Sequence, residues 1–150
     1  MQRFRKAILS PAWICFLWVG VTVGVSMIAT PLRFTAETIT REIALDVGRV
    51  VFAALNKVEL GLLILLLIVV RASGRAATNW AICAGLALIV IAQSAWLTPE
   101  LAARTQIVID GGTPPASYAH AIYSTLELLK IGLLLFLGFS SIQSGASSVR

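Results

Sequence analysis

Four segments of this chain are long and apolar enough to cross a membrane, and no other feature limits its fold as strongly. A membrane-spanning helix needs about 20 consecutive, mostly apolar residues. Residues 7–32 and 76–98 contain no charged side chain, while residues 50–70 and 119–139 are interrupted by two charges each. A composition of 58% hydrophobic and 13% charged residues is typical of a membrane protein rather than of a soluble domain.

The predicted fold is therefore all-α, an integral membrane four-helix bundle. We expect a single domain over residues 1–150, with spans at about 8–30, 48–71, 78–97 and 117–140. The first apolar run is longer than the roughly 7–15 residues typical of a signal peptide, so we interpret it as a permanent span. Pro31 and Pro99 are expected to end the first and third spans, because proline disfavours a helical residue before it.

The loop between the first two spans carries a weaker helical pattern. Within residues 33–47, Glu37 and Arg41 are four residues apart, and Phe34, Ile39 and Ile43 recur at nearly helical intervals. Opposite charges at this spacing and an apolar stripe are typical of an amphipathic helix. The pattern predicts a short helix in the first outer loop, lying at the membrane interface.

Basic residues are distributed unevenly between the ends of the spans. The N-terminus carries Arg3, Arg5 and Lys6, the loop after the second span carries Arg71 and Arg75, and neither contains an acid. The positive-inside rule therefore predicts a multi-pass membrane protein with cytoplasmic N- and C-termini. The net charge of +5 lies largely on that surface and suits anionic lipid. The expected partner is the lipid bilayer and not nucleic acid, which needs a basic cluster on a polar surface.

The two halves of the chain match when the sequence is shifted by 68 residues. The matches include residues that are not aliphatic, namely cysteine, serine, threonine, proline and glutamate. The paired positions are Ile14-Cys15 with Ile82-Cys83, Ser26 with Ser94, Thr30-Pro31 with Thr98-Pro99, and Glu59-Leu60 with Glu127-Leu128. We interpret the bundle as two similar helical hairpins produced by internal duplication, related by an axis along the membrane normal.

Charged side chains lie within the second and fourth spans, where they are costly. In the fourth span, His120, Tyr123, Glu127 and Lys130 are spaced i, i+3, i+7 and i+10, which places them on one helix face. The second span has a corresponding row that ends at Glu59, and we expect the two rows to face each other. The candidate polar site consists of Asn56, Lys57, Glu59, His120, Tyr123, Glu127 and Lys130. Lys57 lies on a different face from Glu59, so its amine can extend towards the interface.

The polar site is open to three functional interpretations. The one that the sequence favours is a structural or accessory role, in which the polar residues pack the bundle or dock a membrane partner. The second is a proton- or cation-coupled carrier that uses Glu59 and Glu127 in a cavity open to the outside, with His120 near its mouth. A carrier of this size would act as a homo-oligomer. The third is a redox accessory associated with haem or quinone, for which the single histidine would require a dimer for bis-histidine ligation.

The sequence contains no pattern that identifies a reaction. Neither Gly-x-Ser-x-Gly nor His-Glu-x-x-His occurs. Cys15 and Cys83 are too few ligands to close a metal site, and we interpret them as small reduced core residues. We therefore expect a non-enzymatic protein with no catalytic residues, no metal and no cofactor.

An ordered set of residues over about 13–140 resembles a known family. In the first half the set is Trp18, Gly20, Ala29-Thr30-Pro31, Phe34, Gly48, Phe52, Asn56 and Glu59. In the second half it is Pro99, Arg104, Gly111, Pro114-Pro115, His120, Tyr123, Glu127 and Lys130. Together these residues resemble the bacterial four-helix membrane proteins of unknown function that are grouped with the transmembrane-protein-205-like domain. The resemblance implies a four-helix integral membrane domain and no assigned chemistry.

Overall fold

The computed structural model describes residues 10–73 and 77–147, and this part of the chain is helical without strands. Within it, four helices are long and apolar enough to cross a membrane, Pro11–Thr35, Arg41–Ala72, Ala77–Ile109 and Ala119–Gln143. They confirm the predicted all-α four-helix bundle and indicate a multi-pass membrane protein. The predicted spans overlap all four helices. Arg3, Arg5, Lys6 and Arg75, on which the predicted orientation depends, lie outside the described residues.

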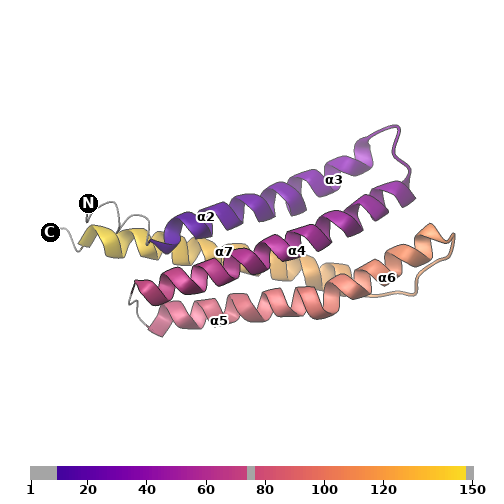
Figure 1. Cartoon of the computed structure of the whole chain (residues 1–150). Helices are drawn as coiled ribbons and strands as arrows, with labels where there is room; N and C mark the ends of the chain where they lie inside the picture. The colour runs from indigo at the N-terminus through magenta and orange to yellow at the C-terminus, as the bar shows by residue number, and fades with distance from the viewer. Residues whose placement is uncertain (1–9, 74–76, 148–150) are drawn as a thin grey trace.

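The second and fourth spans are the uninterrupted helices α4 (Arg41–Ala72) and α7 (Ala119–Ser147). The first span is built from α2 (Pro11–Thr22), a π-helical segment (Val23–Ala29), α3 (Thr30–Leu32) and a 3₁₀ turn (Arg33–Thr35). The third span is built from α5 (Ala77–Ala92), a π-helical segment (Gln93–Leu97) and α6 (Thr98–Ile109). Figure 1 shows each span as one nearly continuous rod, with α2 beginning and α7 ending at the same end of the bundle. We call this the terminus end and the opposite end the loop end.

The two prolines do not end their helices, contrary to the sequence-based prediction. The first span continues through Pro31 to Leu32, and the third continues through Pro99 to Ile109. A proline ring normally clashes with the carbonyl four residues earlier. In both spans a wider π-helical segment precedes the proline, and the amides of Thr30 and Thr98 reach back five residues to Val25 and Gln93. The wider turn accommodates the ring, so the helix continues.

The π-helical segments end at Ala29 and Leu97, which are 68 residues apart, the same shift that aligns the two halves. A local irregularity at equivalent positions supports the predicted duplication. The duplication itself stays a prediction.

The first outer loop differs from its predicted form. Residues 36–40 are not helical, and residues 41–47 form the first turns of α4 rather than a separate short helix. The boundary lies at Thr40, which has extended backbone and accepts the amide of Ile43 through its side chain at 3.4 Å. This N-cap starts the helix. No proline follows within α4, so the helix runs on into the second span.

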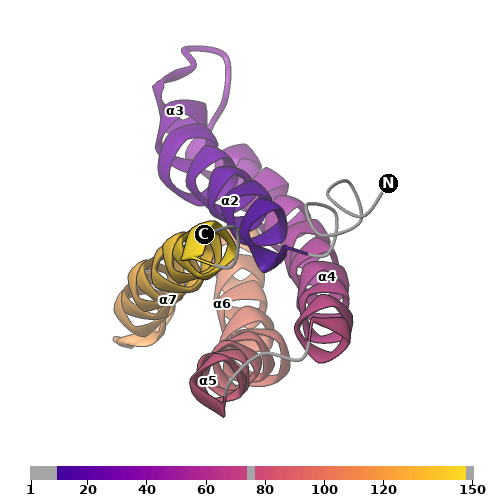
Figure 2. The same ribbon diagram turned by 90° about the vertical axis from the view of Figure 1, so that its left-hand side faces the viewer.

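The four spans surround one core at the terminus end. Viewed from that end, the helices form a ring, with α2 packed on α7 and α4, and the third span packed on α4 and α7 (Figure 2). The buried cluster contains Ile14, Cys15, Trp18, Leu63, Leu66, Val69, Val70, Cys83, Leu86, Val90, Leu134 and Leu137. Towards the loop end the helices diverge (Figure 1). The larger apolar cluster therefore lies in one half of the bundle, and a smaller cluster of Leu97, Ala119 and Tyr123 lies in the other half.

Candidate functional site

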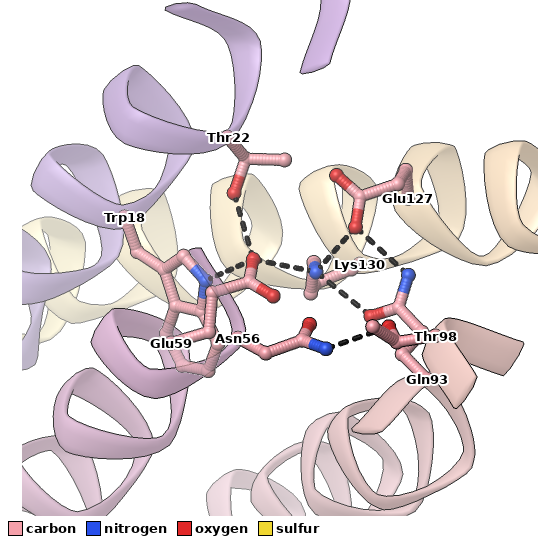
Figure 3. A network of polar contacts seen from close by, with 8 residues as sticks. All are labelled: Trp18, Thr22, Asn56, Glu59, Gln93, Thr98, Glu127 and Lys130. Carbon is pink, nitrogen blue, oxygen red and sulfur yellow. Dashed lines mark hydrogen bonds and ion pairs between the residues drawn. The ribbon is translucent and has the colours of Figure 1, made fainter. Parts of the chain in front are cut away.

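A buried ionic triad joins α4 and α7 near the middle of the bundle. The ammonium of Lys130 lies 2.6 Å from Oε1 of Glu59 and 2.6 Å from Oε1 of Glu127. All three residues are at least 98% buried. The pair within α7 follows from its i, i+3 spacing, whereas the pair with Glu59 requires the two helix faces to meet, as the sequence predicted. Figure 3 shows the three side chains converging from opposite sides.

Uncharged residues of the first and third spans complete the triad's hydrogen bonds. Trp18 Nε1 and Thr22 Oγ1 donate to Glu59 Oε1 at 2.9 and 3.1 Å. Gln93 accepts from the Lys130 ammonium at 2.9 Å and donates to Glu127 Oε1 at 2.8 Å. The ammonium therefore has three acceptors for its three N–H groups. All four spans contribute to one network (Figure 3).

One oxygen of each carboxylate has no partner. Within the two carboxylates, the Oε1 atoms accept all of the hydrogen bonds described above, whereas both Oε2 atoms are buried without a partner among the described residues. When all three groups are ionised, the two carboxylates and the single ammonium sum to a charge of −1. An excess charge away from water is unfavourable unless it is neutralised. The two Oε2 atoms are therefore the places where the triad can bind a proton.

A second polar layer lies on the loop side of the triad. The amide of Asn56 donates to Thr98 Oγ1 at 2.7 Å and connects α4 with the third span (Figure 3). Tyr123 is 4% exposed and packs edge-to-face on Phe52, with 5.4 Å between ring centroids. Its hydroxyl is buried without a hydrogen-bond partner. The polar site therefore continues from the triad towards the open end of the bundle.

A cavity of about 760 Å³ occupies the loop half of the bundle, between all four spans. The lining residues farthest from the loop end are Ser26, Phe52, Thr98 and Leu128, one from each span, and Glu127 is the residue before Leu128. His120 also lines it and is exposed near the mouth. Seven residues of α7 separate His120 from Glu127, which corresponds to about 10 Å along the helix. Glu127 thus connects the triad to the cavity.

Arginines form the charged part of the cavity lining. They come from the 3₁₀ turn after α3, from the first turns of α4 and from α6. The four residues are Arg33, Arg41, Arg49 and Arg104. In the part of the chain that the structure describes, Glu127 is the only acid of the lining, and Lys130 already pairs with it. The cavity is therefore basic at its entrance.

The structure brings together some of the predicted site residues and separates others. Glu59, Glu127 and Lys130 are in direct contact, and Asn56 and Tyr123 lie in the adjacent layer. Lys57 is exposed on the outer surface of α4, away from the triad. His120 lies at the cavity mouth rather than in the network.

Sequence reasoning missed three members of the network, Trp18, Thr22 and Gln93. Trp18 was named only among the residues of the family resemblance, and Gln93 was not considered. A usable signal existed for Gln93, because a glutamine in an otherwise apolar span needs a hydrogen-bonding partner. For Trp18 and Thr22 the sequence offered no comparable signal, since both residues are common in spans.

Among the residues that the structure describes, no three histidine, cysteine or acidic side chains are placed to share a metal ion. Cys15 and Cys83 are both fully buried in the apolar core of the terminus end. His120 is far from them, at the loop end. The chemistry of this site therefore depends on the triad and the cavity.

The fold and the site define a four-span helical membrane protein with a buried ionic network beneath a basic cavity. Comparisons with protein-family models, with curated proteins and with solved structures found no match. The resemblance to the transmembrane-protein-205-like domain accordingly stays a prediction.

Proposed function

We propose that this protein is a proton-coupled membrane carrier in which the triad holds one exchangeable proton beneath a ligand cavity. One observation carries the proposal. Two fully buried carboxylates share a single ammonium, and Oε2 of each carboxylate has no partner. One proton bound at either Oε2 atom would remove the excess negative charge of the triad.

Glu127 is the member of the triad that exchanges its proton with the cavity. It lines the cavity, whereas Glu59 is enclosed by Trp18 and Thr22. The apolar core on the other side separates the triad from the terminus end. A proton on Glu127 Oε2 therefore reaches solvent through the loop end in this conformation. Release to the opposite side requires a second conformation, as expected for alternating access.

The proposal also specifies how the chain is oriented in the membrane and that it forms a homo-oligomer. We place the chain in the bacterial inner membrane with both termini in the cytoplasm, so that the cavity opens to the outside. Large apolar residues such as Leu60, Ile64, Leu88 and Phe136 are exposed on the outer surface of the bundle and provide a lipid-facing surface. A homo-oligomer gives this small bundle a rigid frame against which its hairpins can move. The proposed activity is non-enzymatic transport.

A structural or accessory role is the second candidate, and the hydrogen-bond network favours it. Trp18, Glu59, Gln93 and Lys130 come from four different spans and are bonded into one cluster. Polar contacts between spans fix their packing register. In this alternative the triad keeps the bundle in one shape, and the apolar outer surface docks another membrane protein. In the described part of the chain, His120 and Tyr123 make no side-chain hydrogen bond or ion pair that would favour the redox role.

Infrared difference spectroscopy of the protein in lipid bilayers distinguishes these two functions. Under the carrier proposal, the wild type shows a protonated-carboxyl band that changes with pH and shifts in D₂O, and Glu127→Gln removes that band. Glu37→Gln, a change to an exposed loop acid, leaves it intact. A structural triad with fixed protonation would show no pH-dependent band. That result, with a normally folded Glu127→Gln variant, would contradict the carrier proposal.

A further inference from the structure

We propose that the cavity binds a single organic anion, a carboxylate or phosphate group carried on an apolar body, with its charge at Arg33. This inference rests on the proposed function, because it names the class of ligand that the proton accompanies. The proposed ligand is an anion, whereas the sequence-based interpretation was a proton- or cation-coupled carrier. Three features of the cavity favour an anion. They are the positive charge of the lining arginines, the position of Arg33, and buried polar atoms of the wall that lack hydrogen-bond partners among the described residues.

The charge of the lining favours an anion over a cation. Four arginines line the cavity, and within the described ranges 10–73 and 77–147 only Arg49 has its charge paired, with Asp46 on the same helix turn. Arg104 donates to the carbonyl of Pro115, which leaves its positive charge uncompensated. A lining in which arginines outnumber acids, set between apolar walls, attracts negative charge. A cation entering the cavity would instead be repelled.

Arg33 packs against aromatic rings in the cavity wall. Its guanidinium lies 5.0 Å from the ring centroid of Phe34 and 6.0 Å from that of Phe52. It occupies the space above Gly48, where any added Cβ atom would collide with it. Its Nε is buried without a hydrogen-bond partner. A guanidinium that packs on aromatic faces and keeps a free N–H is well suited to bind a carboxylate or phosphate in a forked geometry.

Other buried atoms of the lining also lack partners. The Tyr123 hydroxyl, Glu127 Oε2 and Ser26 Oγ are buried without hydrogen bonds, and all three residues line the cavity. Tyr123 and Glu127 are 4% and 2% exposed. Buried polar groups are normally satisfied, so a cluster of such groups around one cavity indicates a ligand or water in the functional state.

The rest of the lining suits an apolar body. Leu45, Phe52, Leu101 and Leu128 line the same cavity as the arginines. Its volume of about 760 Å³ lies within the range of about 300–1,000 Å³ that small-molecule sites occupy. The complementary ligand is therefore an amphiphile. A free medium-chain fatty acid and an anionic phospholipid of the surrounding bilayer share this chemistry.

Binding of the anion is coupled to the proton. A bound anion adds negative charge next to a triad that already carries −1 when fully ionised. Uptake of one proton from solution by Glu127 Oε2 offsets the added charge, with no covalent bond formed or broken. The ionisable groups around Glu127 are Tyr123, Lys130 and His120 of α7, Glu59 of α4, and the cavity arginines from the first span, α4 and α6. Anion affinity should therefore rise as pH falls.

The test uses the full chain in nanodiscs of zwitterionic phosphatidylcholine, titrated with carboxyl-¹³C-labelled decanoate and followed by NMR. The wild type is expected to bind one decanoate per chain. Loss of one charge-assisted contact predicts that Arg33→Gln weakens binding about tenfold or more. Gly48→Ala should have a similar effect, because the new methyl group displaces the Arg33 guanidinium. If Arg33→Gln does not fold, weaker decanoate binding by Gly48→Ala tests the same contact.

Two matched variants control for unspecific effects. Gly61→Ala introduces a methyl group into open space on the same helix, and Arg71→Gln removes an exposed arginine at the other end of α4. Both should leave affinity within about twofold of the wild type, as is usual for surface changes. A second arm uses nanodiscs that contain phosphatidylglycerol, with native mass spectrometry to detect retained lipid. One phosphatidylglycerol per chain that is lost in Arg33→Gln would identify the lipid headgroup as the source of the anion.

The outcomes separate this inference from the proposed function. Unchanged binding in Arg33→Gln and Gly48→Ala, or no binding of either anion, would overturn the anion site. The pH-dependent carboxyl band without ligand would still stand and support a proton site with another cargo. Conversely, Arg33-dependent binding with no pH dependence, measured while decanoate stays ionised, would keep the anion site and contradict the coupling.

Discussion

The ammonium of Lys130 on α7 lies 2.6 Å from the Glu59 carboxylate on α4, across the interior of the bundle. Lys130 also pairs with Glu127 on its own helix, so one cation serves two anions. In the hydrocarbon region this arrangement concentrates three charges where an unpaired charge is most costly. The stability of the bundle and its proton chemistry therefore depend on the same three side chains.

Replacing Lys130 by methionine should destabilise the bundle more than any single change to the acids. The variant leaves two buried carboxylates without a cation, and removal of one partner from a buried pair costs about 3–5 kcal/mol. Unfolding in mixed micelles, followed by circular dichroism, measures the loss. Glu59→Gln removes the excess charge and should cost less. A larger loss for Glu59→Gln than for Lys130→Met would contradict the assigned charge balance.

Gln93→Leu should destabilise the protein although it makes the third span more apolar. The amide bridges Lys130 and Glu127, and each buried partner left unsatisfied costs about 1–3 kcal/mol. The same unfolding assay measures the change. Ser94→Leu alters the neighbouring, exposed position and serves as the control. Equal effects of the two substitutions would mean that the bridge does not contribute.

Tyr123→Phe should stabilise the ligand-free protein and weaken anion binding. The hydroxyl is buried without a partner, and its removal recovers part of a desolvation cost of about 1–3 kcal/mol. The ring keeps its edge-to-face contact with Phe52. Thermal unfolding with and without decanoate measures both effects. A destabilised ligand-free variant would show that the hydroxyl already has a partner in the membrane.

Two glycines of α7 should respond in opposite ways to the same substitution. A Cβ atom at Gly138 would lie 3.1 Å from the Phe16 ring and 3.4 Å from Cys15, whereas a Cβ atom at Gly132 meets nothing within 4 Å. Gly138→Leu should therefore separate α2 from α7 and cost about 1–3 kcal/mol by overpacking. Gly132→Leu should be neutral or stabilising by up to about 1 kcal/mol, because leucine favours the helix. Comparable losses at both positions would contradict the observed contact.

The sequence predicted the polar site better than it predicted the loops. The spacing from His120 to Lys130 fixed which side chains share a face of α7, because helical geometry alone decides that relation. The prolines misled the prediction, since Pro31 and Pro99 end a regular α-helix but not one that widens into a π-helical turn before them. In both spans the widening moves the hydrogen-bond acceptor of the residue before the proline from four residues back to five. Helix preferences of single residues do not describe such a change.

What the sequence determined by itself was the class of protein. Four apolar runs and the helical spacing of Glu127 and Lys130 required a helical bundle with charges turned inward, because hydrocarbon penalises any other arrangement. Only the tertiary structure decided that Trp18 and Gln93 join the triad and that Arg33 faces a cavity. Those contacts join residues from separate spans, and they depend on how the helices cross and diverge. Hydropathy and spacing along one helix contain no information about that geometry.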